Sequence, residues 1–292
     1  PNCKWMAPTA SDRSYTPGAE PIKPFEAASI SADGVEQLSG LTITIDVNYD
    51  RGLDRLNANV SLPGVVMHWF ETLGELRIEG VALAAQYTAM LRSVSFMTTS
   101  SKKLDRSVSW AVSGSAHFSS KTGHVYRMFL EPATWTTAKS LCQFNDFFGT
   151  PGYLATVTSA AEADFLAWHV AADGWLGGKQ TDGVWSWVTG PEASANSGAG
   201  THFWEGLDVA NGGVPSVGAF NGWDQDGVVA QPTSGADMSF VRMNLNGEWR
   251  NMAQAALVPG FVCEYGTPAA PVPEGTTGSA SIKWTGCTLT VD

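Results

Sequence analysis

Apolar and polar residues alternate in several stretches between residues 25 and 118. One such run has four apolar residues separated by polar ones: Leu41, Ile43, Ile45 and Val47. A period of two places all four side chains on one face of a strand. A second run alternates through Val108, Trp110 and Val112, and residues 74–80 form a short strand pattern bounded by glycines. Residues 81–91 are rich in helix formers and predict one short helix. The whole segment, residues 25–120, predicts a β-sandwich.

A helical periodicity replaces the alternation after residue 133. Thr134 is a helix-capping residue, and the apolar residues that follow recur on one helix face: Trp135, Ala138, Leu141 and Cys142. The four residues 159–162, Ser-Ala-Ala-Glu, form a capping box for a second helix with Phe165, Leu166 and Val170. These two short helices are followed by a region rich in Trp and Gly.

The two ends of the chain are rich in proline. Residues 1–24 and the linker 267–278 contain repeated prolines among small residues, which favours extended arms. Residues 279–292 alternate again through Ile282, Trp284, Leu289 and Val291. This last segment predicts a strand that either folds back onto the first domain or pairs with another subunit.

Residues 123–266 resemble a C-type lectin-like domain. The resemblance rests on the order of Trp135 to Cys142, Gly152-Tyr153-Leu154-Ala155-Thr156-Val157, Gly174-Trp175-Leu176-Gly177-Gly178, Trp185-Ser186-Trp187-Val188-Thr189-Gly190-Pro191-Glu192, Gly247-Glu248-Trp249-Arg250-Asn251 and Phe261-Val262-Cys263-Glu264-Tyr265. The preceding segment resembles the cadherin-like or immunoglobulin-like repeats of large extracellular proteins, through residues 38–45, 74–80 and 87–96. The two resemblances imply a fold class that is mainly β with an α+β part: a cadherin- or Ig-like sandwich, then a lectin-like domain, with Pro-rich arms at both ends.

The four cysteines fit disulfides better than a metal site, because none lies in a C-x-x-C or Cys/His cluster. The lectin resemblance implies a bond between Cys142 and Cys263. Cys3 and Cys287 are left over and either pair with each other or cross-link different subunits.

Carbohydrate-binding members of the family hold Ca²⁺ through a Glu-Pro-Asn or Gln-Pro-Asp triplet and a later Trp-Asn-Asp. The matching pieces here are Gln231-Pro232-Thr233 and Trp249-Arg250-Asn251. Thr233 is a weak ligand, and Arg250 places a permanent cation where a neutral oxygen belongs. The carboxylates of this region are either ligands of a different calcium site or ordinary solvated side chains. The candidate ligands of such a site are Asp224, Asp226, Gln231, Asp237 and Asn251. We therefore expect no cofactor, with Ca²⁺ as the alternative.

Glycans are a second candidate ligand. The candidate glycan-binding residues are Trp223, Gln231 and Asn251. An exposed indole, such as that of Trp204 or Trp223, can stack on a sugar face. Burial of these indoles in the core is the alternative. The sequon Asn59-Val60-Ser61 is a candidate glycosylation site.

Composition narrows the function classes. The chain has 292 residues, 43% of them hydrophobic, and a formal net charge of −11. Such a charge repels phosphate backbones and excludes nucleic acid as a partner. No apolar run approaches the ~18 residues of a membrane span. Five histidines are scattered without a catalytic motif, so we expect no enzyme: His68, His117, His124, His169 and His202.

We therefore expect an extracellular or cell-surface module that is structural or adhesive. Its expected partners are other copies of itself or other extracellular protein subunits, engaged through the arms and the lectin-like domain. A glycan-binding lectin, dependent on calcium or not, is the alternative.

Overall fold

The computed structural model describes residues 12–31, 37–113, 115–170, 173–225, 227, 229–235, 237–267, 272–273 and 276–284. These residues divide into two units. Unit 1 combines the residues up to Ser120 with those from Pro273 onward, and unit 2 runs from Lys121 to Val272. Unit 2 is therefore an insertion between two strands of unit 1, and each unit is described by itself.

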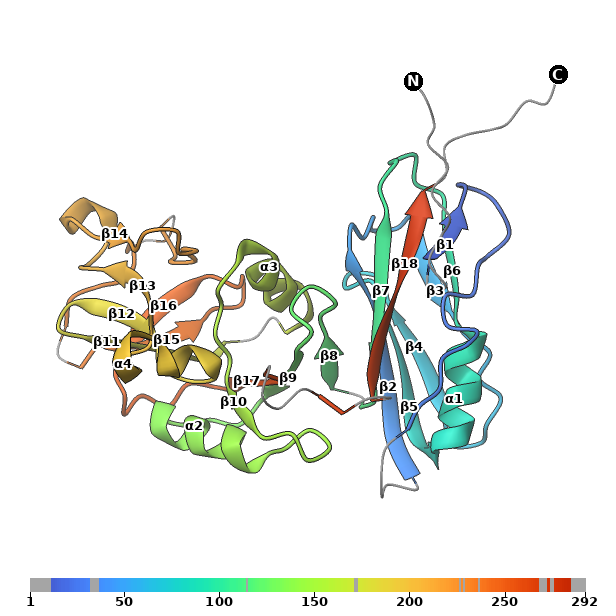
Figure 1. Cartoon of the computed structure of the whole chain (residues 1–292), viewed down its shortest axis with the longest axis horizontal. Helices are drawn as coiled ribbons and strands as arrows, with labels where there is room; N and C mark the ends of the chain where they lie inside the picture. Colours follow the sequence, from blue (N-terminus) through green and yellow to red (C-terminus); the bar gives the residue numbers. More distant parts are fainter. Residues whose placement is uncertain are drawn as a thin grey trace. The chain divides into compact units, whose positions relative to one another are not determined.

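Unit 1 is built on a six-stranded sheet of order β1-β18-β7-β2-β5-β4 (Figure 1). Its strands are β1 (Asp12–Tyr15), β2 (Gln37–Val47), β4 (Val66–Phe70), β5 (Glu75–Leu83), β7 (Arg106–Ala111) and β18 (Thr277–Trp284). A short strand, β8 (Ala116–Phe118), follows β7, and the Ser109 hydroxyl donates to the Phe118 carbonyl at 2.7 Å. The alternation read from residues 41–47 corresponds to the central strand β2, whose Leu41, Ile43 and Ile45 are buried.

A two-stranded sheet and a helix make the other layer of unit 1. The small sheet pairs β3 (Asp54–Asn57) with β6 (Ser95–Thr98), and α1 (Ala84–Ser93) packs on β2 and β5. The side chains of Arg106 on β7 and Asp54 on β3 form a buried ion pair, with Nε 3.1 Å from Oδ2. Among the described residues, the second layer is thus not a full sheet. The predicted helix at 81–91 exists but begins later, because residues 81–83 complete β5.

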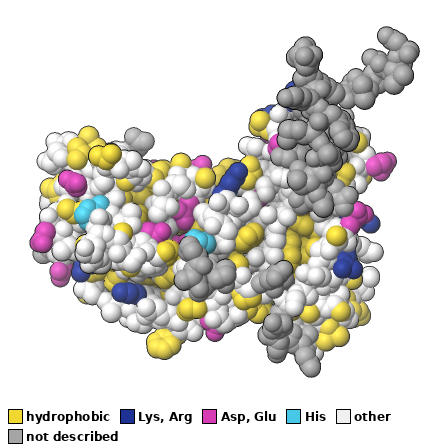
Figure 2. Space-filling model, viewed as in Figure 1, with side chains coloured by type: hydrophobic (Ala, Val, Ile, Leu, Met, Phe, Trp, Pro, Cys, Tyr) yellow, Lys and Arg dark blue, Asp and Glu magenta, His cyan; other side chains and the backbone are white. Residues whose placement is uncertain are grey.

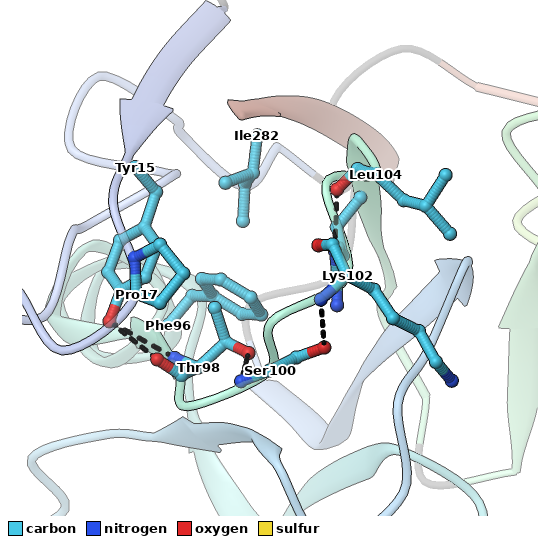
Figure 3. Close-up of a pocket in the computed structure, with 9 residues that line it drawn as sticks. Tyr15, Pro17, Phe96, Thr98, Ser100, Lys102, Leu104 and Ile282 are labelled. Carbon is cyan, nitrogen blue, oxygen red and sulfur yellow. Dashed lines mark hydrogen bonds between the residues drawn. The ribbon is translucent and has the colours of Figure 1, made fainter. Parts of the chain in front are cut away.

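The described parts of the predicted N-terminal arm and of the terminal segment 279–292 belong to unit 1. Strand β1 pairs in parallel with β18, and β18 pairs antiparallel with β7, so both edges of β18 are occupied within this chain. The first alternative for residues 279–292, folding back onto the first domain, therefore applies as far as Trp284. Within the predicted arm 1–24, the Tyr15 hydroxyl donates to the Thr98 carbonyl at 3.0 Å and accepts from the Thr98 amide at 3.2 Å (Figure 3). The arm is in this part an integral strand.

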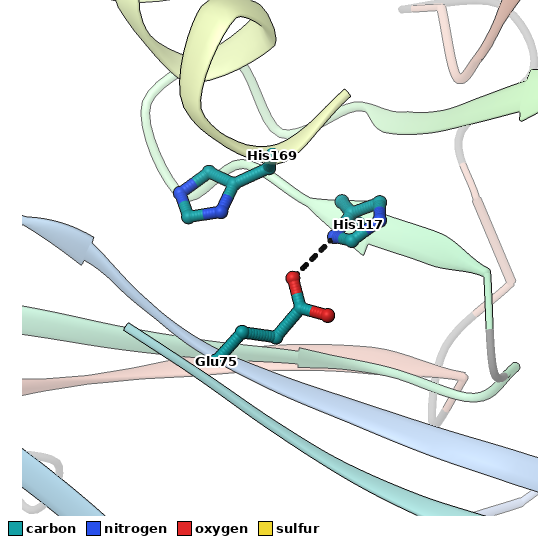
Figure 4. Close-up of side chains that lie close together, drawn as sticks. All are labelled: Glu75, His117 and His169. Atoms are coloured by element: carbon teal, nitrogen blue, oxygen red, sulfur yellow. Dashed lines mark ion pairs between the residues drawn. The ribbon is translucent and has the colours of Figure 1, made fainter. Parts of the chain in front are cut away.

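A buried ion pair lies on the six-stranded sheet. Nδ1 of His117 is 3.2 Å from Oε2 of Glu75 (Figure 4). The Arg77 guanidinium contacts the other carboxylate oxygen. Burial alone would raise the pKa of Glu75, but the charges and hydrogen bonds of His117 and Arg77 outweigh it and lower the pKa to about 2. These contacts explain how β5 accommodates a carboxylate with no exposed surface.

Unit 2 has the sheet order β14-β13-β12-β11-β17-β9, with β10 on β17 and β15 between β11 and β16. The strands are β9 (Val125–Phe129), β10 (Gly152–Leu154), β11 (Gly174–Thr181), β12 (Val184–Trp187), β13 (Thr201–Glu205), β14 (Val214–Pro215), β15 (Phe240–Met243), β16 (Trp249–Met252) and β17 (Phe261–Tyr265). The helices are α2 (Trp135–Phe144), α3 (Ala160–His169), the short α4 (Ala195–Gly198), and the 3₁₀ turns η1 (Pro191–Ser194) and η2 (Val209–Asn211).

The two predicted helices begin where their caps indicate. The Thr134 hydroxyl accepts from the Thr137 amide at 3.3 Å, and the Ser159 hydroxyl accepts from the Glu162 amide at 3.2 Å. The capping box is wrong in one respect, since the Glu162 carboxylate accepts from the Thr158 amide at 2.8 Å. Cys142 on α2 is bonded to Cys263 on β17, as the lectin resemblance implied. Closing a loop over a separation of 121 residues stabilises the fold by about 5 kcal/mol on the chain-entropy model.

The core of unit 2 is dominated by indole rings. Its members include Trp185, Trp187, Trp204, Trp223 and Trp249 together with Phe165 and Leu166 of α3. Edge-to-face contacts connect them; the Trp187 and Trp249 rings, for example, lie 5.1 Å apart at 89°. This aromatic core supports the long loop between β14 and β15, to which it contributes Trp223.

Candidate functional site

The long loop of unit 2 contacts strand β16, which carries the triplet Trp249-Arg250-Asn251. Alternation along β16 buries Trp249 and Asn251 and leaves the Arg250 side chain 40% exposed. Strand β15 pairs with β16 antiparallel and places Val241 opposite Asn251. Arg250 and Asn251 therefore hold different partners in the loop.

Arg250 binds the carboxylate of Asp224. Its Nε lies 2.9 Å and its terminal Nη2 2.5 Å from Oδ2, while Oδ1 accepts from the Gly227 amide at 2.8 Å. Asp224 is only 2% exposed. A guanidinium retains its charge at any physiological pH, so Asp224 is neutralised by a cation from its own chain.

Asn251 uses all four hydrogen-bonding positions of its amide. Its Oδ1 accepts from the Thr233 amide at 2.9 Å and from the Thr233 hydroxyl at 3.1 Å. Its Nδ2 donates to the carbonyls of Thr233 at 2.7 Å and Met238 at 2.8 Å. The Gln231 side-chain oxygen accepts from the Asn251 backbone amide at 3.1 Å. Both lone pairs of the Asn251 carbonyl oxygen are therefore occupied.

The remaining predicted calcium ligands do not complete a site. Asp237 is exposed, with its backbone carbonyl accepting from the Ser239 amide at 2.7 Å, and Asp226 lies outside the described residues. Calcium needs six to eight oxygens, several of them charged. Asp224, Gln231 and Asn251 are brought together, but their oxygens bind Arg250 and the loop backbone. The candidate ligands that the structure describes do not fit a calcium ion.

Of the two roles considered for Trp223 and Trp204, sugar stacking and burial in the core, the structure shows burial. Trp223 is 4% exposed and its ring packs edge-to-face on Trp185 at 4.8 Å, while Trp204 has no exposed surface. Both indoles belong to the core, the alternative left open by the sequence. Cys3 and Cys287 lie outside the described residues.

A second polar cluster in unit 2 was not predicted. The Tyr126 hydroxyl donates to Oε1 of Glu162 at 2.6 Å, and the Glu264 carboxylate accepts from the Thr156 amide at 3.0 Å and contacts Nδ1 of His124. Glu162 and Glu264 are 3% and 1% exposed. Burial, and then the charge of Glu264, raise the pKa of Glu162 to about 7. The Tyr126 hydroxyl also lies 3.4 Å from Oε1 of Glu264, so it stands between the two carboxylates.

Sequence reasoning assigned Glu162 only a capping role and used Glu264 only as part of the closing Cys-Glu-Tyr. A signal was available, because both acidic residues stand in apolar surroundings within predicted elements. Their approach depends on β17 and α3 meeting, which no local pattern encodes.

The surface agrees with the acidic composition. Figure 2 shows Asp and Glu side chains scattered over the visible face. Among the described residues, no helix is long and apolar enough to cross a membrane.

Comparison with known proteins identifies the second unit. Residues 131–219 match the family model described as "Lectin C-type domain". Unit 2 holds a C-type lectin domain. The chain is also 29% identical over 273 residues to Halomucin of Haloquadratum walsbyi (strain DSM 16790 / HBSQ001), a match that covers 89% of this chain and 3% of Halomucin. The chain thus spans a small part of that relative's length. The lectin domain and this relative are consistent with an extracellular surface protein.

Several solved structures are similar to the lectin part at low identity. The C-type carbohydrate-recognition domain of cow CD23, solved in the presence of an oligosaccharide, is 18% identical, with 50% of this chain and 90% of that chain covered and a TM-score of 0.32. The carbohydrate-recognition domain of the mouse scavenger receptor C-type lectin is 18% identical, with 53% and 98% covered and a TM-score of 0.36. A calcium-independent type II antifreeze protein is 17% identical, with 51% and 90% covered and a TM-score of 0.34.

Proposed function

We propose that the chain is a non-enzymatic module of an extracellular surface protein, and that its lectin domain binds protein partners without calcium. The observation that carries the proposal is the ion pair of Arg250 with Asp224 in the long loop. The ion pair allows the long loop to keep its conformation without a metal ion. The side chains of the loop can then contact a protein partner.

The charge balance of the loop supports independence from calcium. The two guanidinium nitrogens of Arg250 bind one oxygen of Asp224, and the Gly227 amide binds the other. A divalent ion would have to displace a permanent cation from a nearly buried carboxylate and also break the bonds of Asn251 to Thr233. Each charge-assisted bond of the Asp224 carboxylate contributes about 1.5–3 kcal/mol, and each neutral bond of Asn251 about 0.5–1.5 kcal/mol.

Calorimetric titration with calcium tests the proposal. We expect no binding heat for the wild-type chain at millimolar calcium, and the same result for the exposed control Arg51→Asn. The triple variant Thr233→Asp, Arg250→Asn, Asn251→Asp removes the internal cation and adds two carboxylates, so we expect it to gain calcium affinity. Saturable binding by the wild-type chain would overturn calcium independence.

The proposed partners are further copies of the chain or other extracellular protein subunits. Strand β18 already has β1 as its neighbour on one edge and β7 on the other. We therefore propose that the terminal segments contact their partners through residues outside these paired strands. Sedimentation at increasing protein concentration tests self-association. A monomer over the whole range excludes further copies and leaves other subunits as partners.

A glycan-binding lectin is the second candidate, supported by the match of residues 131–219 to the lectin family model. A glycan array probed with and without a chelator separates the two candidates. Binding that survives the chelator supports a calcium-independent lectin, whereas an array without binding favours a protein partner.

A further inference from the structure

Asn59 belongs to the only Asn-x-Ser/Thr sequon in the sequence, Asn59-Val60-Ser61. It lies in the connection between β3 and β4 of unit 1, and both Asn59 and Ser61 are exposed. No described residue forms a hydrogen bond with the side-chain amide of Asn59. The side-chain nitrogen of Asn59, Nδ2, is therefore accessible to solvent.

The backbone around the sequon is held in place. The backbone amide of Asn59 donates to the Ser93 hydroxyl at 2.9 Å, and that hydroxyl donates to the Met90 carbonyl at 2.7 Å. Ser93 is the last residue of α1. The connection is consequently fixed to the helix end while its side chains remain accessible.

A groove of about 270 Å³ begins at the sequon and runs along α1. It is lined by Asn59, Ser61, Leu62, Gln86, Ala89, Met90 and Ser93. Its lining combines apolar groups of Leu62, Ala89 and Met90 with polar groups of Gln86 and Ser61. Oε1 of Gln86 accepts from the Leu83 amide at 2.9 Å, which leaves its Nε2 to donate. A mixture of apolar surface with few polar groups suits a sugar ring, although the volume lies at the small end of ligand sites, about 300–1,000 Å³.

We propose that Asn59 carries an N-linked glycan and that its first sugar lies in this groove. In the attachment, Nδ2 of Asn59 forms a bond to the anomeric carbon of a lipid-linked oligosaccharide phosphate. The bond from that carbon to the phosphate oxygen breaks, the lipid phosphate leaves with the electron pair, and one amide proton passes to a base of the transferase. The sequon places the Ser61 hydroxyl within the same acceptor tripeptide. All these residues belong to unit 1, so the proposal is independent of the long loop of the lectin domain.

Secretion of the full chain from a host with N-glycosylation tests the attachment. Intact-mass and glycopeptide spectrometry should find the glycan on Asn59, and none on the variants Asn59→Gln and Ser61→Ala. The matched control Ser61→Thr retains the sequon and should retain the glycan. An unmodified Asn59 in secreted chain that has formed the Cys142–Cys263 disulfide would overturn the proposal.

Hydrogen exchange tests the position of the first sugar. The glycosylated chain should exchange more slowly at residues 59–62 and 84–93 than the same chain after enzymatic removal of the glycan, whereas peptides of unit 2 should not change. Equal exchange rates in the groove peptides would show an attached glycan that points into solvent, and would overturn the assignment of the groove.

Discussion

Individual residues decide what the lectin domain can bind. Arg250 and Asn251 stand where the family's calcium-binding triplet would be, and each satisfies the groups around it without a metal. The sequence already indicated this through the charge of Arg250. It did not indicate that Asp224 would be the partner, because 26 residues separate the two and only the loop closure brings them together.

Glu162 provides a prediction at the same scale. Its pKa in the folded chain is about 7, above the ordinary value of 4.5, because burial and the charge of Glu264 disfavour its carboxylate. A raised folded-state pKa gives stability that is fully present below pH ~4.5 and is lost as the pH rises through about 7. We expect Glu162→Gln to be more stable than the wild type at pH 8, by on the order of 2 kcal/mol.

Urea unfolding of unit 2, followed by tryptophan fluorescence between pH 4.5 and 8, measures this effect. Asp164→Asn is the matched control, since Asp164 is an exposed carboxylate on the same helix. The control should retain the wild-type decline of stability with pH, and Glu162→Gln should lose most of it. The same decline in Glu162→Gln would show that the pH dependence arises elsewhere.

Secondary-structure elements divide into those with a local signal and those without one. The periodicities of residues 41–47, 135–142 and 160–170 are local, so β2, α2 and α3 could be predicted from the sequence with their caps. The position of β18 could not, because pairing with β1 and β7 joins segments more than 165 residues apart. The cadherin- or Ig-like character of unit 1 stays a prediction.

Strand β18 should be essential to unit 1. Deleting residues 277–292 removes the neighbour of both β1 and β7 and exposes the buried side chains of Val108 and Trp110. We expect unit 1 to unfold while unit 2 stays folded, because no strand of its sheet is lost. Limited proteolysis with mass spectrometry would then recover residues near 121–272 as a resistant fragment. Deletion of residues 285–292 alone is the control and should leave both units resistant; a resistant unit 1 without β18 would contradict its structural role.

At the scale of the whole molecule, the first and last described strands of the chain, β1 and β18, are neighbours in the sheet of unit 1. Asp12 of β1 is paired with Ser281 of β18, and the lectin domain is inserted between β8 and β18. Both terminal segments of the described chain therefore belong to unit 1, and the lectin domain is joined to unit 1 at both of its ends.

The insertion predicts that unit 2 folds alone. Residues 121–272 contain the complete tryptophan core and the Cys142–Cys263 disulfide, whose two cysteines have no exposed surface. An excised fragment expressed under oxidising conditions should therefore unfold cooperatively. Under reducing conditions it should lose about 5 kcal/mol of stability. The double variant Cys142→Ala, Cys263→Ala is the control and should show no response to the reductant. A fragment that remains unfolded with its disulfide formed would mean that the lectin domain depends on unit 1 for its structure, and would contradict the prediction.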